Sequence, residues 1–517
     1  MADDTIKIKI AGGDRVIEAS QGANLLTCLQ ENGIPVAADC GGRGQCGKCL
    51  VRVAPIADEG VIAGIPLRLA CTYRVTKDIC VLVPEPREDD IVVTGFSLKD
   101  IASYLGSKDS NKDGNLGVAV DVGTTTIFVK LIDLTDGREL ASKGFSNPQR
   151  AFGADVISRI EKSKDDAGEL SKIITEKIDS EIADLLAETV TSKTSVKRIV
   201  ISGNTAMTYI LLGLRCASLA DAPFVPEYEI GDKYNYAEIF KTDTLDCECI
   251  VVPFASSFIG GDVLSGLVYI DEVVCPVGEF MLMDLGTNGE IVYSAEGKTM
   301  MTSAAAGPAL EGGYISCGMS AVPGAIYSVA RAKVDCRASL AMTTEERFAV
   351  EVIGSVKAEG LCGSGIIDLM ACLLRGGSLT KGGSFASSVS SNGVSVSEDI
   401  RLLQEDVREF QLAKSAIRSG AEILIRENDG KLPERLYISG GFGLNLNIDN
   451  AQTVGLLPEV SKENIVFIGN SSIEGAALIC QKPELLERVK EIAKDGISLN
   501  LAEQEDFEDK FVENITF

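Results

Sequence analysis

The stretch VAVDVGTTT, Val118–Thr126, reads as an apolar strand that ends in a glycine–threonine turn. A near-copy, LMDLGTNGE, recurs at Leu282–Glu290, and YISGGFG at Tyr437–Gly443 ends a third apolar strand in glycines. Glycine lets such a turn approach phosphate oxygens, and threonine hydroxyls and backbone N–H groups can donate hydrogen bonds to them. One D-x-G-T turn is weak evidence, because glycine–threonine turns are common. Two of them with a later Gly-Gly-x-Gly turn predict an ATP site, and the alternative is a set of structural turns.

The sequence around these turns predicts an α/β domain from residue 117 onward. Strands such as RIVISGN and RLYISGG alternate with helices such as FQLAKSAIRSGAEILIRE. In Glu169–Thr189 apolar residues recur at helical spacing, so one face of that helix should be buried. The sequence lacks the GxxxxGK[ST] pattern, which excludes a P-loop enzyme.

Cysteines and glycines crowd a second stretch, DCGGRGQCGKC at Asp39–Cys49. With a later cysteine it forms the pattern Cys40-x5-Cys46-x2-Cys49-x21-Cys71. A [2Fe–2S] cluster needs four thiolates, which plant-type ferredoxins supply as C-x4-C-x2-C…C, and the longer first gap here resembles the adrenodoxin-like subclass. A zinc knuckle is the alternative, but zinc sites usually contain two C-x2-C pairs. We therefore predict a [2Fe–2S] cluster that carries one electron at low potential, about −400 mV for plant-type clusters.

The patterns divide the chain into two domains and a linker. Residues 1–92 read as short strands around one helix and the cysteine loop, which predicts a ferredoxin-type α+β domain. Residues 93–116 include the polar, turn-forming segment SKDSNKDGN, as expected of a linker. Residues 117–517 form the predicted ATPase domain.

Composition narrows the classes of function. The chain has 517 residues, a formal net charge of −26 and no histidine. The charge argues against nucleic-acid and anionic-membrane partners, and it fits either basic protein partners or solubility alone. The missing histidine excludes a Rieske centre, a histidine–zinc site and a histidine general base. We expect a cytoplasmic protein, because no secretory signal or membrane span is evident and the 15 cysteines suit a reducing compartment.

The three glycine-rich turns resemble the phosphate-1, phosphate-2 and adenosine motifs of the actin, sugar-kinase and Hsp70 ATPase superfamily. The resemblance implies an actin-like, ribonuclease-H-like domain of two lobes, lobe I at about 117–280 and lobe II at about 281–517, with ATP between them. It implies that Asp121 and Asp284 position Mg²⁺, usually through water. The implied phosphate contacts are Gly123, Thr124, Thr125, Gly286, Thr287 and Asn288, and the implied adenosine contacts are Gly440, Gly441 and Gly443.

A ferredoxin-type domain joined to this ATPase resembles the reductive activators of corrinoid proteins. Segments that carry the resemblance include NPQRAFGADVISRI, ISGNTAMTYILLGL, AAAGPALEGG and GMSAVPGAI. The resemblance implies a β-grasp fold for residues 1–92. It also implies ATP-dependent transfer of one electron to the inactive cobalt(II) of a corrinoid protein, which regenerates cobalt(I). The implied partners are a corrinoid methyltransferase or corrinoid/iron–sulfur protein and an upstream low-potential electron donor, and a homodimer is suggested by the resemblance alone.

The sequence departs from this family in two places. The GNTAM segment continues to Tyr209, where a histidine is expected in relatives, so no role of that histidine carries over. Residues 93–116 leave room for only a short connector, so a longer middle domain of some relatives is expected to be missing.

Further candidate residues each have a structural alternative. Asp262, after a Gly-Gly turn, is a candidate to orient the attacking water, or else the N-cap of the helix that follows. The uncharged segment Ser316–Gly324 is a candidate to face a corrin ring, with Ser320 near cobalt, although plain loop packing is the favoured interpretation. Cys247 and Cys249 have no cysteine companions nearby and are interpreted as structural.

Two other functions remain open on the sequence alone. Activators of radical dehydratases or aromatic-ring reductases also join iron–sulfur chemistry to this ATPase fold, but they typically share a [4Fe–4S] cluster across a dimer. A non-enzymatic electron carrier with a nucleotide-sensing module would bind ATP without hydrolysing it. An iron and sulfide count separates the first alternative from our interpretation, and an ATP hydrolysis assay separates the second.

Overall fold

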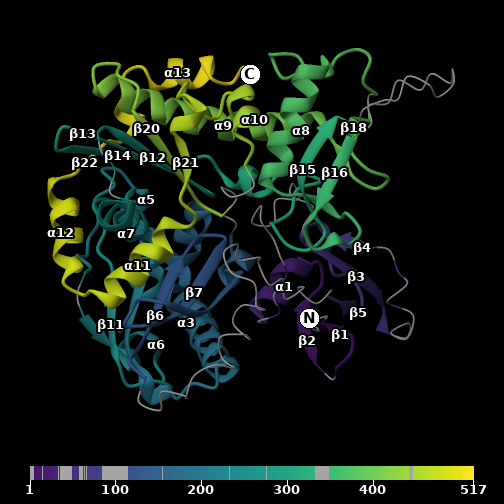
Figure 1. Ribbon diagram of the computed structural model, residues 1–517. Helices are drawn as coiled ribbons and strands as arrows, with labels where there is room; N and C mark the ends of the chain where they lie inside the picture. Colours follow the sequence, from purple (N-terminus) through teal and green to yellow (C-terminus); the bar gives the residue numbers. More distant parts are fainter. Residues whose placement is uncertain are drawn as a thin grey trace.

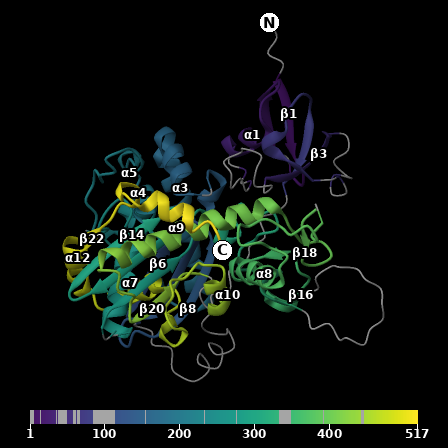
Figure 2. The same cartoon turned by 90° about the horizontal axis from the view of Figure 1, so that it is seen from above.

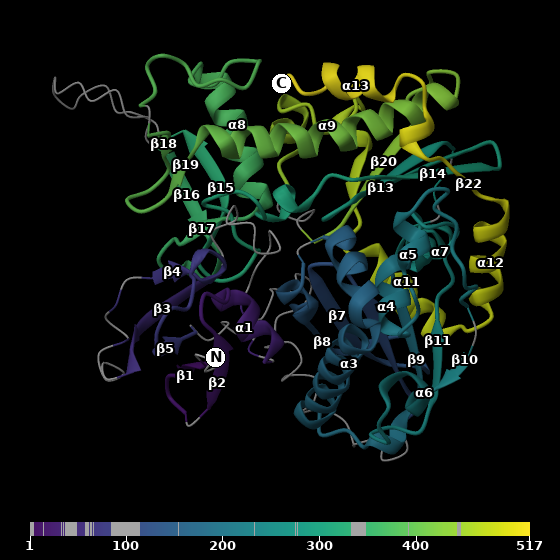
Figure 3. The ribbon, with the colours of Figure 1, turned by 180° about the vertical axis from the view of Figure 1, so that it is seen from behind.

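A small N-terminal domain lies beside a larger domain built on two six-stranded sheets (Figure 1). The views from above and from behind place it on one side of the larger domain (Figures 2 and 3). This computed structural model describes residues 5–13, 15–32, 34, 36, 49–56, 62, 65, 67–83, 114–153, 155–231, 233–274, 276, 278–331, 348–390, 392–441 and 446–517. The predicted fold class, a ferredoxin-type domain followed by a two-lobed α/β domain, is confirmed.

The N-terminal domain is a five-stranded mixed sheet in the order β2-β1-β5-β3-β4, packed against one helix. β1 pairs antiparallel with β2 and parallel with β5. The side chains of Ile8, Leu25, Leu29, Val51 and Ile79 are almost completely removed from water and form its core. Its elements are β1 Thr5–Ile10, β2 Val16–Ser20, α1 Leu25–Glu31, β3 Leu50–Pro55, β4 Leu67–Leu69, the 3-10 turn η2 Ala70–Thr72 and β5 Ile79–Leu82.

Lobe I is a six-stranded sheet in the order β10-β11-β9-β6-β7-β8. Helix α3 packs on it through the predicted apolar face, because Leu170, Ile174, Ile178 and Ile182 are all buried against the sheet. Its elements are β6 Leu116–Val122, β7 Thr126–Asp133, β8 Glu139–Ser146, η3 Pro148–Ala151, α3 Val156–Glu188, η4 Lys193–Ser195, β9 Val196–Gly203, α4 Thr205–Leu211, α5 Ala217–Ala220, β10 Lys233–Asn235, α6 Tyr236–Phe240 and β11 Glu248–Val251.

Lobe II is a second six-stranded sheet in the order β21-β20-β12-β13-β14-β22, with the long helix α9 across it (Figure 1). Its main elements are β12 Phe280–Leu285, β13 Gly289–Ala295, β14 Lys298–Ala304, η6 Pro308–Glu311, α9 Gln404–Glu427, β20 Arg435–Ser439, α10 Ile448–Thr453, η9 Lys462–Asn464, β21 Ile465–Phe467, β22 Ile497–Ser498, η10 Leu501–Glu503 and α13 Phe507–Glu513. A subdomain on the side of the N-terminal domain holds β15 Ala325–Arg331, β16 Phe348–Val352, η7 Ile353–Ser355, β17 Gly360–Leu361, α8 Gly363–Gly376, β18 Val394–Ser395 and β19 Arg401–Leu402.

Two helices lie between the two large sheets, α7 (Gly261–Tyr269) and α11 (Ser471–Gln481). Glycines let them touch: a Cβ at Gly266 would lie 2.6 Å from the Ser471 hydroxyl, and one at Gly475 would overlap a backbone carbonyl of α7. α11 also packs on β6 and β9, although it comes from the C-terminal half of the chain. The two lobes therefore share one packed core, which continues into η5 Ile270–Val274 and α12 Leu485–Asp495. Within the described residues, no helix has both the length and the hydropathy of a transmembrane segment.

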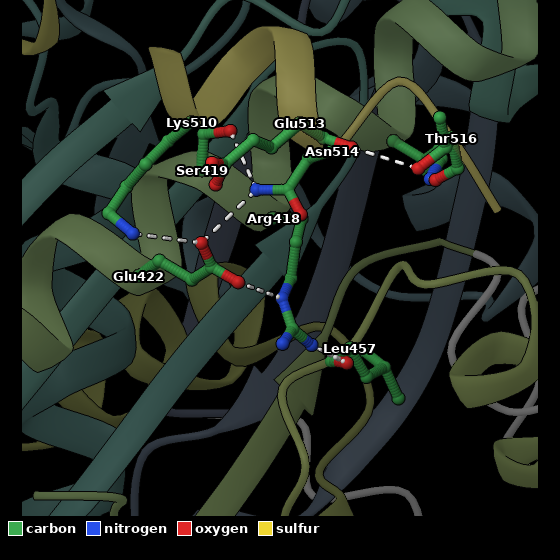
Figure 4. Close-up of polar contacts among 9 residues, drawn as sticks. Arg418, Ser419, Glu422, Leu457, Lys510, Glu513, Asn514 and Thr516 are labelled. Atoms are coloured by element: carbon green, nitrogen blue, oxygen red, sulfur yellow. Dashed lines mark hydrogen bonds and ion pairs between the residues drawn. The ribbon is translucent and has the colours of Figure 1, made fainter. Parts of the chain in front are cut away.

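A half-buried carboxylate, Glu422, connects the C-terminal helix α13 to α9 (Figure 4). Glu422 accepts hydrogen bonds from Arg418 Nε at 2.8 Å, from Asn514 Nδ2 at 3.2 Å and from Lys510 Nζ at 3.4 Å. Burial opposes ionisation, but the Arg418, Asn514 and Lys510 contacts hold the pKa of Glu422 below its ordinary value. α9 in turn contacts η6, which reaches the cleft described below.

We expect a Glu422→Gln variant to lose about 1–2 kcal/mol of unfolding free energy at neutral pH, because the two cations lose their partner. A carboxylate whose folded-state pKa is lowered stabilises the fold above its unfolded pKa, about 4.3, and this stability is lost as the pH falls through the folded value. The difference between variant and wild type should therefore shrink below about pH 4 in urea titrations. Glu491→Gln, at an exposed surface pair, is the control and should change stability little; an equal loss there would refute the role of Glu422.

Candidate functional site

A cleft of about 320 Å³ is lined by both D-x-G-T turns and the Gly-Gly turn, a volume within the range of small-molecule sites. Its walls also contain Asp262, Ser320 and the glutamates Glu139, Glu290, Glu311 and Glu474. The predicted residues that the structure brings together here are Asp121, Gly123, Thr124, Thr125, Asp284, Gly286, Thr287, Asn288, Gly440 and Gly441. The remaining one, Gly443, lies outside the described residues.

Parallel strands bring these turns to one place. β6 pairs parallel with β9, and β12 pairs parallel with β20, so the carboxyl ends of the strands meet at the same edge of each sheet. Asp284 lies opposite Ser439 in register, and the Ser439 hydroxyl donates to Asp284 Oδ2 at 3.1 Å. Asp121 accepts hydrogen bonds of 2.8 Å from Asn470 Nδ2 and from the Ser472 hydroxyl at the start of α11. The C-terminal half of the chain thus orients the carboxylate at the end of β6.

Four carboxylates concentrate negative charge in the cleft: Asp121 is buried, and Asp262, Asp284 and Glu290 are half-buried. Burial raises the pKa of Asp121, although hydrogen bonds from Asn470 and Ser472 oppose the shift. Burial and the charge of Asp121 raise the pKa of Asp262 and of Asp284 to about 7. Burial, with Asp262 and Asp284 nearby, raises the pKa of Glu290 well above its ordinary value. A cation would favour the ionised forms.

This set of carboxylates fits a cation that is bound through water molecules rather than directly. Among the described residues, no group of three or more aspartate, glutamate or cysteine side chains is arranged to enclose a metal ion directly. Mg²⁺ usually keeps several waters and is bound through one or two carboxylates and the substrate's phosphates. The arrangement therefore suits Mg²⁺ that reaches Asp121 and Asp284 through water better than a closed protein cage.

Asp262 is not the N-cap of α7, so that alternative is wrong. The cap is Gly260, and Asp262 is the second helical residue, where its Oδ1 accepts a hydrogen bond of 2.8 Å from Val263 N. Gly260 is required because a Cβ there would overlap the backbone of Asn204. The Asp262 carboxyl group faces the cleft, and its role in orienting water stays a prediction.

The two D-x-G-T turns touch across the lobes. The hydroxyls of Thr125 and Thr287 lie 2.7 Å apart, and both donate to one oxygen of Glu311, Thr125 at 2.7 Å. Thr124 is held separately, because its hydroxyl accepts a hydrogen bond of 3.0 Å from Asn204 Nδ2. The two lobes therefore meet at the hydroxyls that were predicted to bind phosphate.

Backbone geometry explains two of the glycines. Gly440 has a φ of +109°, and a Cβ there would overlap the carbonyl of Leu285 and lie 3.0 Å from Asp284 Oδ1. At Gly123 a Cβ would overlap the carbonyl oxygen of Thr126. Gly441, by contrast, faces open space, which leaves room for a ligand at this end of the cleft.

Two of the four predicted cluster cysteines lie together in the N-terminal domain. Cys49 precedes β3 and Cys71 lies in η2, both are buried, and the backbone N–H of Cys71 points to Cys49 Sγ at 3.5 Å. Such N–H···S contacts are typical around iron–sulfur ligands, so this pair fits a [2Fe–2S] cluster. Cys40 and Cys46 lie outside the described residues. Cys247 and Cys249 are buried around β11, in keeping with a structural role.

Ser320 lies in the wall of the cleft, which is also lined by Glu311 and Ala321. The segment that leads to it is anchored at Ser316, whose backbone N and hydroxyl donate to Asp406 at 2.6 and 2.7 Å. The predicted approach of Ser320 to cobalt stays a prediction.

Comparison with known proteins matches the three parts of the chain. Residues 279–517 match the family model described as the C-terminal ASKHA domain of RACo, and residues 116–271 match the RACo middle region. This chain belongs to the family of reductive activators of corrinoid proteins. Residues 8–76 match the 2Fe-2S iron–sulfur cluster binding domain. The middle region is thus present and coincides with lobe I, so the expectation that a middle domain is missing is wrong.

Relatives of this activator support the same family. The corrinoid activation enzyme RamQ of Eubacterium limosum is 31% identical over 78% of this chain and 70% of its own length. The [Co(II) methylated amine-specific corrinoid protein] reductase of Methanosarcina barkeri is 28% identical over 73% of this chain and 72% of its own. A solved reductive activator for corrinoid, iron-sulfur protein aligns over 99% of this chain and 98% of its own, with a TM-score of 0.70 and 26% identity. The resemblance inferred from the sequence is confirmed.

Sequence reasoning missed several residues of the cleft. Glu290 and Glu311 lie inside segments that the motifs had already marked, DLGTNGE and AAAGPALEGG, but a single glutamate in a glycine-rich segment gave no signal. Asn204, Asn470 and Ser472 reach the turns only through the fold. Their place in the cleft follows from contacts between segments that are distant in the sequence.

Proposed function

We propose that this activator uses ATP to deliver one electron to the cobalt(II) of a corrinoid protein and so restores cobalt(I). The observation that carries the proposal is the joining of a 2Fe-2S domain to a cleft in which two D-x-G-T turns meet across the lobes. The names of the relatives, one a Co(II) corrinoid protein reductase and another a reductive activator, support the substrate. The proposed partners are a corrinoid methyltransferase or corrinoid/iron–sulfur protein and an upstream low-potential donor.

The electron-carrying part of the proposal rests on the N-terminal domain. Cys40, Cys46, Cys49 and Cys71 would hold the cluster. A [2Fe–2S] cluster bound by four such thiolates supplies the carriage of one electron at low potential. The N–H of Cys71 would orient the Cys49 sulfur and stabilise its negative charge. The side chain of Gln30 in α1 donates to the carbonyl of Ala151, which attaches this domain to lobe I at the last residue of η3.

The ATP-dependent part rests on the cleft. Asp121 and Asp284 would position Mg²⁺ through water, and Thr125 and Thr287 would donate to phosphate oxygens. Because the two turns belong to different lobes, a nucleotide held by both favours one arrangement of the lobes. A nucleotide can drive an uphill reduction only if it binds one state of the activator–corrinoid complex better than another.

Asn147 connects the first D-x-G-T turn to the segment that contacts the N-terminal domain, so a nucleotide-dependent change at that turn can be transmitted to this domain. Its Nδ2 donates to the carbonyl of Gly123 at 2.8 Å, and its backbone N donates to the carbonyl of Thr125 at 2.8 Å. The 3-10 turn that follows contains Ala151, which accepts the hydrogen bond from Gln30. A movement of the first D-x-G-T turn would therefore reach the attachment of the electron-carrying domain.

The test is reduction of a purified corrinoid protein in the cobalt(II) state by the whole activator, a low-potential reductant and Mg-ATP. The cobalt(I) absorption band should appear with ATP and stay absent with ADP. No ATP-dependent cobalt(I) with several corrinoid partners would contradict the proposal. ATP hydrolysis that is never accompanied by cobalt(I) would instead favour activation of another class of enzyme.

The raised carboxylate pKa values predict that Mg-ADP stabilises the protein more at about pH 8 than at about pH 6. Asp262 and Asp284 have pKa values of about 7 in the fold, against about 3.9 when unfolded. Between these values the folded state binds more protons than the unfolded chain, so stability falls as the pH rises and levels off above about pH 7. A cation recovers that stability only where the carboxylates are ionised, and its apparent affinity should fall about tenfold per pH unit and per group below pH 7.

Thermal unfolding with and without Mg-ADP at the two pH values measures this effect. ADP with Na⁺ at matched ionic strength is the control, because it adds nucleotide without a divalent ion. An equal Mg²⁺-dependent shift at both pH values would show that Asp262 and Asp284 do not hold the cation.

A further inference from the structure

The carboxylate of Glu311 occupies the point where the two D-x-G-T turns meet. One of its oxygens accepts from the hydroxyls of both Thr125 and Thr287, which are themselves 2.7 Å apart. The two threonines are almost fully buried, at 9% and 5% exposure, so water does not replace this contact easily. Glu311 adds negative charge to the cleft, where it helps to raise the pKa of Asp284.

A terminal phosphate and Glu311 compete for the same donors. A threonine hydroxyl has one hydrogen, so a hydroxyl that donates to Glu311 cannot donate to a phosphate oxygen at the same time. A phosphate group brought near the Glu311 carboxylate also repels it, because like charges in a partly desolvated site interact strongly. Binding of a terminal phosphate to these hydroxyls therefore requires the Glu311 side chain to leave.

The backbone after Glu311 is built to pass on such a movement. Gly312 has a φ of +80°, and a Cβ there would lie 2.5 Å from Met319 N and 2.6 Å from Met319 O. A Cβ at Gly318 would overlap the carbonyl of Gly312. The chain at Gly312 is thus in direct backbone contact with Gly318 and Met319, and it cannot shift without moving them.

The segment is anchored on one side and faces the cleft on the other. Ser316 is fixed by two hydrogen bonds to Asp406, a buried residue of α9. Met319 N donates to the carbonyl of Leu361 in β17 at 2.9 Å, and the next residue, Ser320, lines the cleft. Displacement at Glu311 would therefore change the position of Met319 and Ser320 relative to Ser316.

We propose that Glu311 senses the terminal phosphate of the nucleotide: ATP displaces its carboxylate from Thr125 and Thr287, and the release repositions the backbone of Met319–Ala321. The inference rests on the proposed ATP site and adds to it a specific residue that distinguishes ATP from ADP. ADP lacks the terminal phosphate and leaves Glu311 in place. The backbone around Ser320 would then take one position when ATP is bound and another when ADP is bound.

The test compares wild type with Glu311→Gln and Glu311→Ala, using ADP and a non-hydrolysable ATP analogue in titration calorimetry. Both variants should bind the analogue about tenfold more tightly than wild type, because the competing charge is gone, while ADP affinity changes less than about twofold. Hydrogen exchange of residues 316–324 should respond to the analogue in wild type and not to ADP. In Glu311→Ala the analogue should cause no further change there.

Glu398→Ala, an exposed glutamate of the same lobe, is the matched control and should behave as wild type. Glu311→Gln keeps the side chain's shape, so it guards against a folding defect in the alanine variant. Unchanged ratios of analogue to ADP affinity in both variants would overturn the role of Glu311 while leaving the ATP site intact. A wild type that binds neither nucleotide would instead refute the proposed function itself.

Discussion

A Cys71→Ser variant should lose the visible absorption of the iron–sulfur cluster and all ATP-dependent cobalt(I) formation, while its nucleotide binding stays unchanged. Cys71 lies in η2, is buried, and its N–H points to the sulfur of Cys49. A [2Fe–2S] cluster needs four thiolates, two on each iron, so a serine at this position removes one of the two thiolates from one iron. Wild type should contain about two iron atoms and about two sulfides per chain, and the variant less than about a tenth of that.

Cys28→Ser is the matched control for this experiment. Cys28 is also buried in the N-terminal domain, but it lies in α1, and burial together with the charge of Glu31 raises the pKa of its thiol. A protonated thiol is a poor metal ligand, so this variant should keep both iron and activity. A Cys71→Ser protein with full iron content and cobalt(II) reduction would contradict the predicted ligand set. Cys46→Ser, which alters the loop itself, should behave like Cys71→Ser.

The sequence predicted the parts of the cleft that depend on local pattern. The two D-x-G-T turns follow buried strands and line one cavity. Their positions were predictable because each turn directly follows an apolar strand in the sequence. The apolar face of α3 was equally predictable, since its spacing is a property of one helix. The four-cysteine spacing identified the N-terminal domain for the same reason.

Contacts between distant segments could not be predicted in this way. Glu311 accepts a hydrogen bond from Thr125 only because η6 of lobe II packs against the first D-x-G-T turn, which belongs to lobe I. α11 carries Ser472 to Asp121 across two lobes, and no pattern near either residue indicates the other. The N-cap alternative for Asp262 placed the start of α7 two residues too late, because close packing against Asn204 selects Gly260 as the cap. These features depend on how the lobes pack, which a single sequence does not display.

An Asp284→Asn variant should hydrolyse ATP at least about 100-fold more slowly and lose ATP-dependent cobalt(I) formation in proportion. Asp284 is the second-last residue of β12, accepts a hydrogen bond from Ser439 and lies in the cleft with Asp121. The substitution keeps the shape of the side chain but removes the charge that would hold Mg²⁺ through water. Steady-state hydrolysis at increasing Mg²⁺ measures the loss, and higher Mg²⁺ should recover only part of it.

Asp262→Asn separates the two proposed roles of these carboxylates in the cleft, water orientation and cation binding. If Asp262 orients the attacking water, Asp262→Asn should lose hydrolysis yet bind Mg-ATP with nearly wild-type affinity. Asp284→Asn should instead lower the apparent affinity for Mg²⁺, so that hydrolysis needs a higher Mg²⁺ concentration. Asp495→Asn, at the exposed end of α12, controls for the loss of a negative charge elsewhere. Wild-type hydrolysis and Mg²⁺ dependence in Asp284→Asn would remove Asp284 from the cation site. The acidic cleft would then rest on Asp121, Asp262 and Glu290, which are the remaining carboxylates whose pKa burial raises there.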